Sequence, residues 1–160
     1  DALPICAKMG MHFVAGTSRK YFPNAKLVAE CEEFAKISGG SVAFEEDAYA
    51  AVSDADIVYT DVWVSMGEPD EVWEERIRDL TPYKVTMDLM KHAKPDAIFL
   101  HCLPAFHDRN TAIGREMGER FGIADMEVTD EVFQKYANVV FDEAENRMHT
   151  IKAVMAATLG

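Results

Sequence analysis

Short apolar segments alternate with helical segments along this chain, and this alternation limits the folds that it can adopt. Between the apolar segments, hydrophobic residues recur at the three- and four-residue spacing of helices. Strands that alternate with helices form parallel sheets covered by helices on both faces. The sequence therefore predicts an α/β fold, a Rossmann-like three-layer domain with a parallel sheet of about five strands. The expected strands are residues 11–16, 41–44, 56–60, 97–101 and 138–141, and the expected helices include residues 25–37, 70–80, 86–91, 111–120, 129–136 and the segment from 143 onward.

The composition is that of a globular protein and excludes several classes of partner. The 160 residues are enough for one domain with a sizeable core. With 28 acidic and 16 basic residues, the net charge of −12 opposes binding to nucleic acid and to anionic membranes. No apolar run reaches the roughly 20 residues of a membrane span, and no signal peptide is recognised. Three cysteines without metal-ligand spacing predict neither a disulfide framework nor a zinc site, so we expect a reducing, cytoplasmic location.

Reactive side chains gather where two of the expected strands end. The strand at residues 97–101 leads through His101 into Cys102–Asp108, which holds a cysteine, a further histidine and an aspartate. The strand at residues 56–60 leads into Asp61–Glu68. Open α/β sheets place their ligand sites at the carboxyl ends of strands. Together with the turn at residues 16–19, these loops predict a small-molecule site, and we expect the site of an enzyme.

Asp61 is the candidate for holding a cationic group. A carboxylate at the end of a buried strand, before the apolar run Val62–Val64, is well placed to bind an ammonium ion. The segment Ser65–Gly67 would then close over the ligand, because glycine allows close backbone approach. The alternative is that Asp61 caps the following helix. A phosphate-binding turn at Gly16–Ser18 is a further hypothesis, although the glycine-rich dinucleotide fingerprint is absent.

Cys102 is a weaker candidate for covalent chemistry. Covalent catalysis needs a base that removes the thiol proton of Cys102, and His101 and His107 are the two candidates. His101 is a poor partner, because adjacent strand residues point to opposite faces. A metal site from His101, Cys102, His107 and Asp108 lacks any standard spacing. Arg147 carries a permanent charge that can bind an anion at the same edge of the sheet. The alternative is that the segment around it is simply the solvent-exposed start of a helix. The residues therefore support a small-molecule site with a cation-holding aspartate, a nearby cysteine and an arginine.

Three motifs extend this argument. They are Asp-Val-Trp-Val-Ser-Met-Gly-Glu at 61–68, His-Cys-Leu-Pro-Ala-Phe-His-Asp at 101–108 and Glu-Asn-Arg-Met-His-Thr at 145–150. Their order and spacing resemble those of ornithine carbamoyltransferases, as does the connecting segment at 126–132. The resemblance covers essentially the whole chain. The Ser65-Met66-Gly67 form is similar to enzymes that use ornithine rather than aspartate or acylated ornithine.

The resemblance implies a reaction and its ligands. Members of the family transfer the carbamoyl group of carbamoyl phosphate to the δ-amine of L-ornithine, giving citrulline and phosphate. The resemblance implies no cofactor and no metal. By the same resemblance, Asp61, Ser65 and Met66 match the residues that hold the amino-acid end of ornithine.

The remaining implied roles concern the reacting groups. Cys102 matches the cysteine beside the reacting amine, as a polar contact and not as a covalent nucleophile. The backbone carbonyl of Leu103 would bind the carbamoyl nitrogen. Arg147 matches the arginine that contacts carbamoyl phosphate and stabilises charge on its carbonyl oxygen. The resemblance thus implies Cys102, Arg147 and Asp61 as the catalytic residues.

The chain also departs from the family pattern. Members are about twice as long and carry an N-terminal domain with a Ser-Thr-Arg-Thr phosphate loop and a His-Pro-x-Gln segment, neither of which occurs here. We therefore expect a single ornithine-binding domain over residues 1–160, inactive without the carbamoyl-phosphate-binding domain. The apolar stripe of the last helix continues through Leu159. It would pack on that domain, and the alternative is that the helix docks on the sheet. A homotrimer or higher assembly is expected of the full-length protein.

Two other classes of function stay open at this point. One is a non-catalytic module that binds ornithine or another amino acid, and the other is a cysteine-dependent hydrolase. Anabolic and catabolic roles use the same residues, so the sequence does not separate them.

Overall fold

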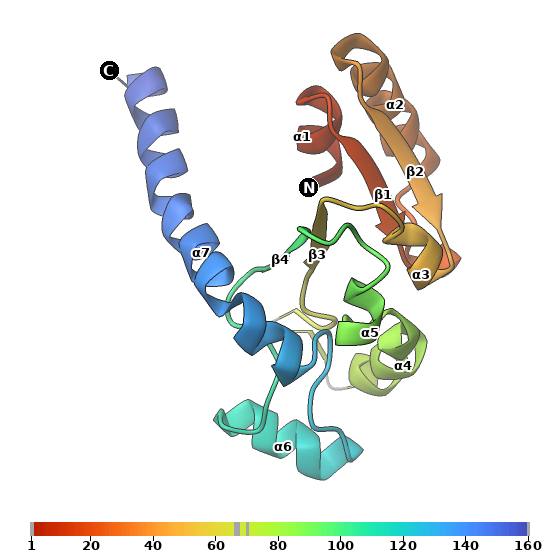
Figure 1. The fold of residues 1–160 in the computed structure, drawn as a ribbon, viewed down its shortest axis with the longest axis vertical. Helices are drawn as coiled ribbons and strands as arrows, with labels where there is room; N and C mark the ends of the chain where they lie inside the picture. Colours follow the sequence, from red (N-terminus) through yellow and green to blue (C-terminus); the bar gives the residue numbers. More distant parts are fainter. Residues whose placement is uncertain (1, 66–67, 70, 160) are drawn as a thin grey trace. The chain divides into compact units, whose positions relative to one another are not determined.

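The computed structural model describes residues 2–65, 68–69 and 71–159 (Figure 1). The chain divides into two units, Asp1–Ser53 and Asp54–Gly160. Each unit contains a pair of parallel strands with helices beside it, so the predicted α/β class is confirmed. The described residues form four strands in two two-stranded sheets, where the sequence predicted about five strands in one sheet.

The first unit alternates helices and strands in the predicted order. Its strands β1 (His12–Gly16) and β2 (Ser41–Glu45) run parallel, with His12 opposite Ser41 and Gly16 opposite Glu45. The buried residues Leu3, Ala7, Cys31 and Ala35 pack with Phe13, Leu27, Phe34, Val42 and Phe44 to form its core. The helical elements are α1 (Ala2–Lys8), η1 (Arg19–Tyr21), α2 (Ala25–Ser38) and α3 (Ala48–Ala51).

Local signals fix both ends of α2. The Asn24 side chain accepts a hydrogen bond from the Leu27 N–H at 3.0 Å, as an N-cap does. At the other end, Gly39 has a φ of 85°, which a residue with a side chain rarely adopts. In the turn after β1, the Thr17 N–H donates to the Glu45 carbonyl and the Arg19 N–H donates to a Glu46 carboxylate, so these two N–H groups do not point to a phosphate site.

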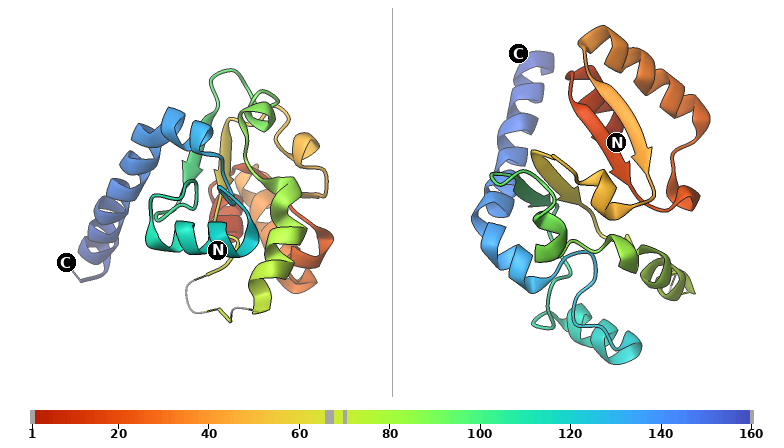
Figure 2. Two further views of the ribbon diagram at one scale, coloured as in Figure 1. Left: turned by 90° about the horizontal axis from the view of Figure 1, so that it is seen from below. Right: turned by 45° about the vertical axis from the view of Figure 1, so that its right-hand side comes forward.

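The second unit contains the two loops with reactive side chains. Its strands β3 (Ile57–Thr60) and β4 (Ile98–His101) are parallel, and a separate parallel bridge joins Val85 to Val128. Phe99 of β4 is fully buried. Figure 2 shows the helices around this pair, and α7 packs against β4. These helices are α4 (Glu71–Leu80), η2 (Thr81–Tyr83), α5 (Met87–Met90), α6 (Ala112–Phe121) and α7 (Asp130–Leu159).

The strand predicted at residues 138–141 is wrong, because these residues lie inside α7. Their β-branched and aromatic side chains favour a strand locally. However, no glycine or proline interrupts residues 130–159. Val132, Phe133 and Val140 are buried, and their spacing of seven or eight residues repeats every two helical turns. Burial of one helical face therefore outweighs the local strand preference and joins the two predicted helices into one.

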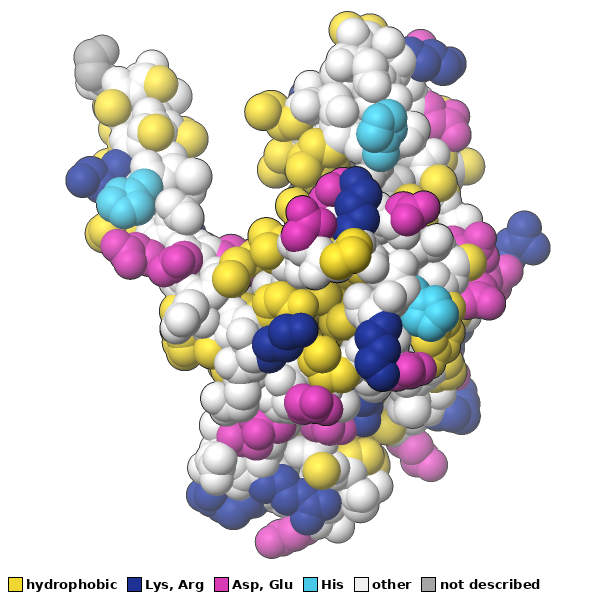
Figure 3. All heavy atoms as spheres, in the orientation of Figure 1, with side chains coloured by type: hydrophobic (Ala, Val, Ile, Leu, Met, Phe, Trp, Pro, Cys, Tyr) yellow, Lys and Arg dark blue, Asp and Glu magenta, His cyan; other side chains and the backbone are white. Residues whose placement is uncertain are grey.

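The second half of α7 is exposed along its whole length. Every residue from Ala144 to Leu159 is exposed, and Figure 3 shows apolar side chains uncovered along this end of the helix. The predicted apolar stripe thus does continue to Leu159, which is 80% exposed. Among the described helices, none combines the length and apolar character needed to cross a membrane. The exposed apolar residues of the stripe are Met148, Ile151, Val154, Met155 and Leu159.

Candidate functional site

The ends of β3 and β4 bring the two predicted loops together. Thr60 pairs with His101 at the last register position, so Asp61 and Cys102 leave the same edge of the sheet. The Cys102 thiol donates a hydrogen bond to Asp61 Oδ1, with 2.9 Å between the sulfur and the oxygen. Asp61 is exposed, so its carboxylate is accessible to a cationic ligand. Asp61 does not cap α4, which begins at Glu71.

The titratable groups beside Asp61 are held in their protonated forms. Burial, the hydrogen bond to Asp61 and the Asp61 charge raise the pKa of Cys102 to about 11. Burial, with the nearby Glu143, Cys102 and Asp61, raises the pKa of Tyr59 to about 12. Because the thiolate is the nucleophilic form of cysteine, this environment disfavours covalent catalysis by Cys102. The thiol is suited instead to a polar contact with a ligand.

The loop after β3 is anchored on the core. Trp63 and Val64 are buried, whereas Ser65 is exposed. Ser65 and Glu68 share two hydrogen bonds: the Ser65 N–H donates to the Glu68 carboxylate at 2.9 Å, and the Glu68 N–H donates to the Ser65 carbonyl at 3.2 Å. The Glu68 carboxylate also lies 3.6 Å from the guanidinium of Arg76. Ser65 is therefore held at a loop surface that a ligand can reach. The predicted substrate residue Met66 lies outside the described residues.

The other two predicted site residues lie on the loop after β4 and on α7. Leu103 follows it in the loop, is 38% exposed and forms a cis peptide bond with Pro104. Arg147 is exposed on α7, one turn beyond Glu143. Residues four apart share a helix face, and the Glu143 carboxylate accepts the His101 N–H at 3.1 Å. Arg147 thus shares the helix face that meets the end of β4, although within the described chain it makes no contact with Asp61 or Cys102.

His101 is not available as a base or as a metal ligand. It is 1% exposed. Its Nε2 atom lies 2.9 Å from Glu127 Oε1, and its Nδ1 atom contacts the carbonyl oxygen of Cys102. Burial by itself lowers the pKa of His101, but the Glu127 hydrogen bond, the Cys102 carbonyl and the negative charge of Glu127 outweigh it and raise the pKa. The metal set imagined from His101, Cys102, His107 and Asp108 is therefore not assembled.

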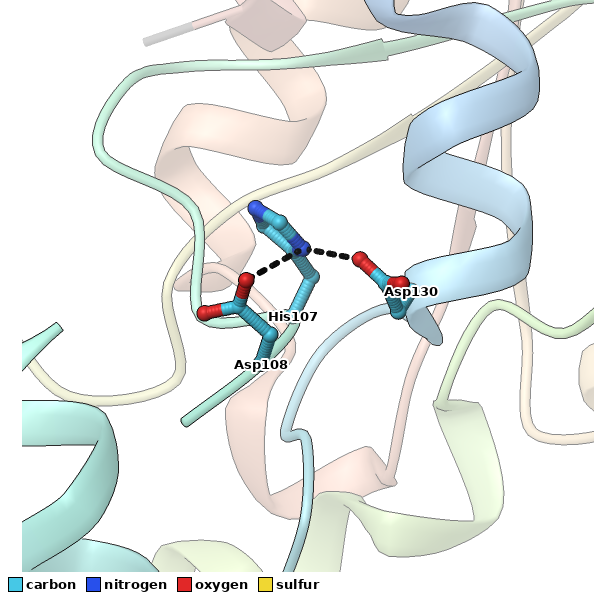
Figure 4. Close-up of side chains that lie close together, drawn as sticks. All are labelled: His107, Asp108 and Asp130. Carbon is cyan, nitrogen blue, oxygen red and sulfur yellow. Dashed lines mark hydrogen bonds and ion pairs between the residues drawn. The ribbon is translucent and has the colours of Figure 1, made fainter. Parts of the chain in front are cut away.

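A different cluster has the donor atoms for a metal ion. In the described part of the chain, one donor atom each from His107, Asp108 and Asp130 lie within 4.8 Å of one another (Figure 4). Imidazole nitrogen and carboxylate oxygen are both ligands of divalent cations. His107 Nδ1 lies 2.7 Å from Asp130 Oδ1 and 3.9 Å from Asp108 Oδ2, so a proton on Nδ1 satisfies Asp130 without an ion. The ring also stacks on Phe133, with 3.7 Å between the centroids. The cluster thus fastens the loop after β4 to the start of α7.

Glu127 is the residue beside this site that the sequence did not single out. Its side chain is fully buried and contacts both His101 and the Phe106 N–H. The signal for it was a lone carboxylate between the apolar Met126 and Val128. A carboxylate between two apolar residues indicates a buried charge, but it does not identify the residue that pairs with Glu127.

A separate hollow of about 590 Å³ lies between α4 and α6. None of its lining residues belongs to the loops after β3 and β4, so it is not part of this site. Its lining residues are Glu71, Glu74, Ile77, Arg78, Arg120 and Phe121.

Comparison with protein families gives a match over residues 1–158, to the model described as "Aspartate/ornithine carbamoyltransferase, Asp/Orn binding domain". Among curated proteins, the chain is 56% identical over 154 residues to the catabolic ornithine carbamoyltransferase of Treponema denticola. That alignment covers 96% of this chain and 46% of the relative. The chain therefore spans about half the length of the curated relatives it matches.

Solved structures give a concordant match. The anabolic ornithine carbamoyltransferase of Campylobacter jejuni superimposes with a TM-score of 0.81 at 31% identity, over 97% of this chain and 45% of that one. The ornithine carbamoyltransferase of Pyrococcus furiosus gives a TM-score of 0.75 at 42% identity, over 94% of this chain and 42% of that one.

Proposed function

Because this chain belongs to the aspartate/ornithine carbamoyltransferase family, as its Asp/Orn-binding domain, we propose that it is the ornithine-binding half of an ornithine carbamoyltransferase. The observation that carries the proposal is the contact between Asp61 and Cys102, an exposed carboxylate beside a protonated thiol at the ends of adjacent strands. We also propose that residues 1–160 work as one domain, which the similarity to solved structures over 97% of the chain supports.

Ornithine is the substrate assigned to this half. Asp61, Ser65 and Met66 hold its amino-acid end, and an exposed carboxylate suits the cationic amino group. Cys102 lies beside the δ-amine. A neutral thiol there offers a hydrogen-bond partner and leaves the amine as the nucleophile.

Carbamoyl phosphate meets the same edge from the other side. The Leu103 carbonyl accepts a hydrogen bond from the carbamoyl nitrogen, and the Arg147 guanidinium contacts the carbamoyl oxygen. The neutral δ-amine attacks the carbonyl carbon and forms the new C–N bond. The tetrahedral oxyanion is stabilised by cationic donors, the C–O bond to phosphate breaks, and the amine proton is released. Catalysis of this kind depends on positioning the two substrates.

The second half of the site is supplied by a carbamoyl-phosphate-binding domain, and the active assembly is a homotrimer or higher. The isolated chain is therefore inactive. The test is citrulline formation by the chain alone and by a fusion to the corresponding first half of the Treponema denticola relative. We expect turnover only in the fusion, lost on Cys102→Ala and on Arg147→Ala.

Two results contradict this proposal. Turnover by the pure chain would mean that no second domain is needed. A folded, inactive fusion together with calorimetric binding of ornithine by the chain would favour the alternative of a non-catalytic ornithine-binding module.

A further inference from the structure

One buried carboxylate, that of Glu127, holds both ends of the loop that carries the proposed site residues. Its Oε1 atom accepts hydrogen bonds from His101 Nε2 at 2.9 Å and from the Phe106 N–H at 2.6 Å. These two residues bracket the segment 102–105, which contains Cys102 and Leu103. A single oxygen atom therefore fixes the start and the end of the loop.

Hydrogen bonds also anchor the backbone around Glu127. The Glu127 carbonyl accepts the Val85 N–H at 2.9 Å, and the Met126 N–H donates to the Phe106 carbonyl at 2.9 Å. Met126 and Val128 are buried on either side. The carboxylate thus reaches the loop from an anchored segment, and an anchored segment can hold the loop in one position.

The charge of the pair is set by its contacts. The two ring nitrogens of His101 face two acceptors, Glu127 Oε1 and the Cys102 carbonyl oxygen. Two acceptors require two N–H donors, so the geometry favours the imidazolium form. Glu127 and Glu143 are the carboxylates in contact with His101, and Asp61 adds a further negative charge nearby.

A buried ion pair is a costly way to stabilise a fold. Taking both charges out of water offsets much of their attraction, so an apolar pair of similar volume is often as stable. Moreover, Glu127 Oε2 is buried without a hydrogen-bond partner among the described residues, and such an atom lowers stability. The buried contacts of Glu127 therefore point to a role in holding the loop in one conformation.

We propose that Glu127 is a positioning residue, which sets the Cys102 thiol and the Leu103 carbonyl by clamping His101 and Phe106. The catalytic consequence rests on the proposed function, whereas the clamp itself does not. Removal of the carboxylate leaves the Asp61 and Cys102 side chains chemically unchanged but frees the segment 102–105 between His101 and Phe106. Since a displacement of about 1 Å can cost on the order of a hundredfold in rate, the clamp predicts a large effect without direct contact to substrate.

The clamp is tested first on the chain itself, by amide hydrogen exchange and imidazole NMR. In Glu127→Ala, the Phe106 amide should exchange at least about tenfold faster, because it loses its acceptor. Glu127→Gln keeps an acceptor oxygen, so the Phe106 amide should stay protected while His101 loses its proton at lower pH. Thr129→Val is the matched control, since Thr129 Oγ1 is also buried without a partner in the described chain; it should change neither signal.

The kinetic consequence is then tested in the active fusion, below the melting temperature of each variant. Glu127→Ala should lower kcat about a hundredfold, and Glu127→Gln should recover most of it. A wild-type kcat or an unchanged Phe106 amide in Glu127→Ala, or an unchanged His101 titration in Glu127→Gln, would overturn the proposal. If the unaltered fusion is inactive, the proposed function fails, and the NMR measurements still decide whether the clamp exists.

Discussion

The thiol of Cys102 gives a direct test of the site geometry through its reaction with an alkylating reagent. Its pKa of about 11 arises from burial, then from the hydrogen bond to Asp61 and from the Asp61 charge. Asp61→Ala removes the second and third causes and leaves burial. The pKa should therefore fall toward the ordinary value of 9.0 without reaching it.

The size of the effect follows from the thiolate fraction. At about pH 8, a thiol with a pKa of 11 contains about a hundredfold less thiolate than one with a pKa of 9. The more basic thiolate is about six- to tenfold more nucleophilic, so the net rate is lower by roughly tenfold. Asp61→Ala should recover part of this factor, a several-fold increase in alkylation rate.

The assay is iodoacetamide alkylation of the native chain, followed by mass spectrometry of the peptide that contains Cys102. The rate is measured across pH, with the half-buried Cys6 of the same sample as an internal standard for the reagent. Asp56→Ala is the matched control, because Asp56 precedes β3 as Asp61 follows it, and instead pairs with Lys94 at 2.6 Å. If Asp61→Ala and the unaltered chain give the same rate-against-pH profile, Asp61 does not restrain the thiol and the proposed pairing is refuted.

Three further predictions concern stability. Val140→Ala should lower the free energy of unfolding by about 1–3 kcal/mol, because Val140 is fully buried in α7. Val154→Ala on the exposed half of the same helix should change it by less than about 0.5 kcal/mol. Urea titrations compare the two variants, and equal effects would argue against the packing described. Asn24→Ala removes the N-cap of α2 and should cost about 1 kcal/mol by the same titration, and no loss would mean that the cap contributes nothing. Because the folded pKa of His101 is raised, its stabilising contribution is complete below 6.5 and disappears as pH rises through the folded value. The difference in urea midpoint between the unaltered chain and His101→Gln should thus shrink as the pH rises above 6.5, and a difference that grows would reverse the sign we assign.

Local signals explain why much of the fold was predictable. The cap at Asn24 and the glycine at Gly39 act through neighbouring residues, so the sequence shows them directly. The proximity of the loops that carry Asp61 and Cys102 was also expected, because parallel neighbouring strands end at one edge. Each of these inferences needs only the period of a segment and the residues at its ends.

What escaped prediction depends on distant parts of the chain. The Asn138–Phe141 segment has strand-forming residues, and only packing on the core makes it helical. Glu127 meets His101, 26 residues earlier, and no periodicity specifies which charge will face another at that separation. The sequence marked Arg147 only as an arginine that can bind an anion, and its role at carbamoyl phosphate came from the resemblance, since its exposed side chain does not differ from those of other surface arginines.

The unbroken course of α7 has a consequence for how the protein melts. Half of its 30 residues gain nothing from packing within the unit, and an isolated helix of about 12–15 residues is marginal in water. Its helicity there rests on intrinsic propensity, to which Ala153, Ala156 and Ala157 contribute. On warming, this end should unwind gradually from its terminus while the buried half stays folded. The helical ellipticity measured by circular dichroism should then decrease steadily with temperature before the cooperative unfolding transition. This gradual loss would come from the exposed half of α7.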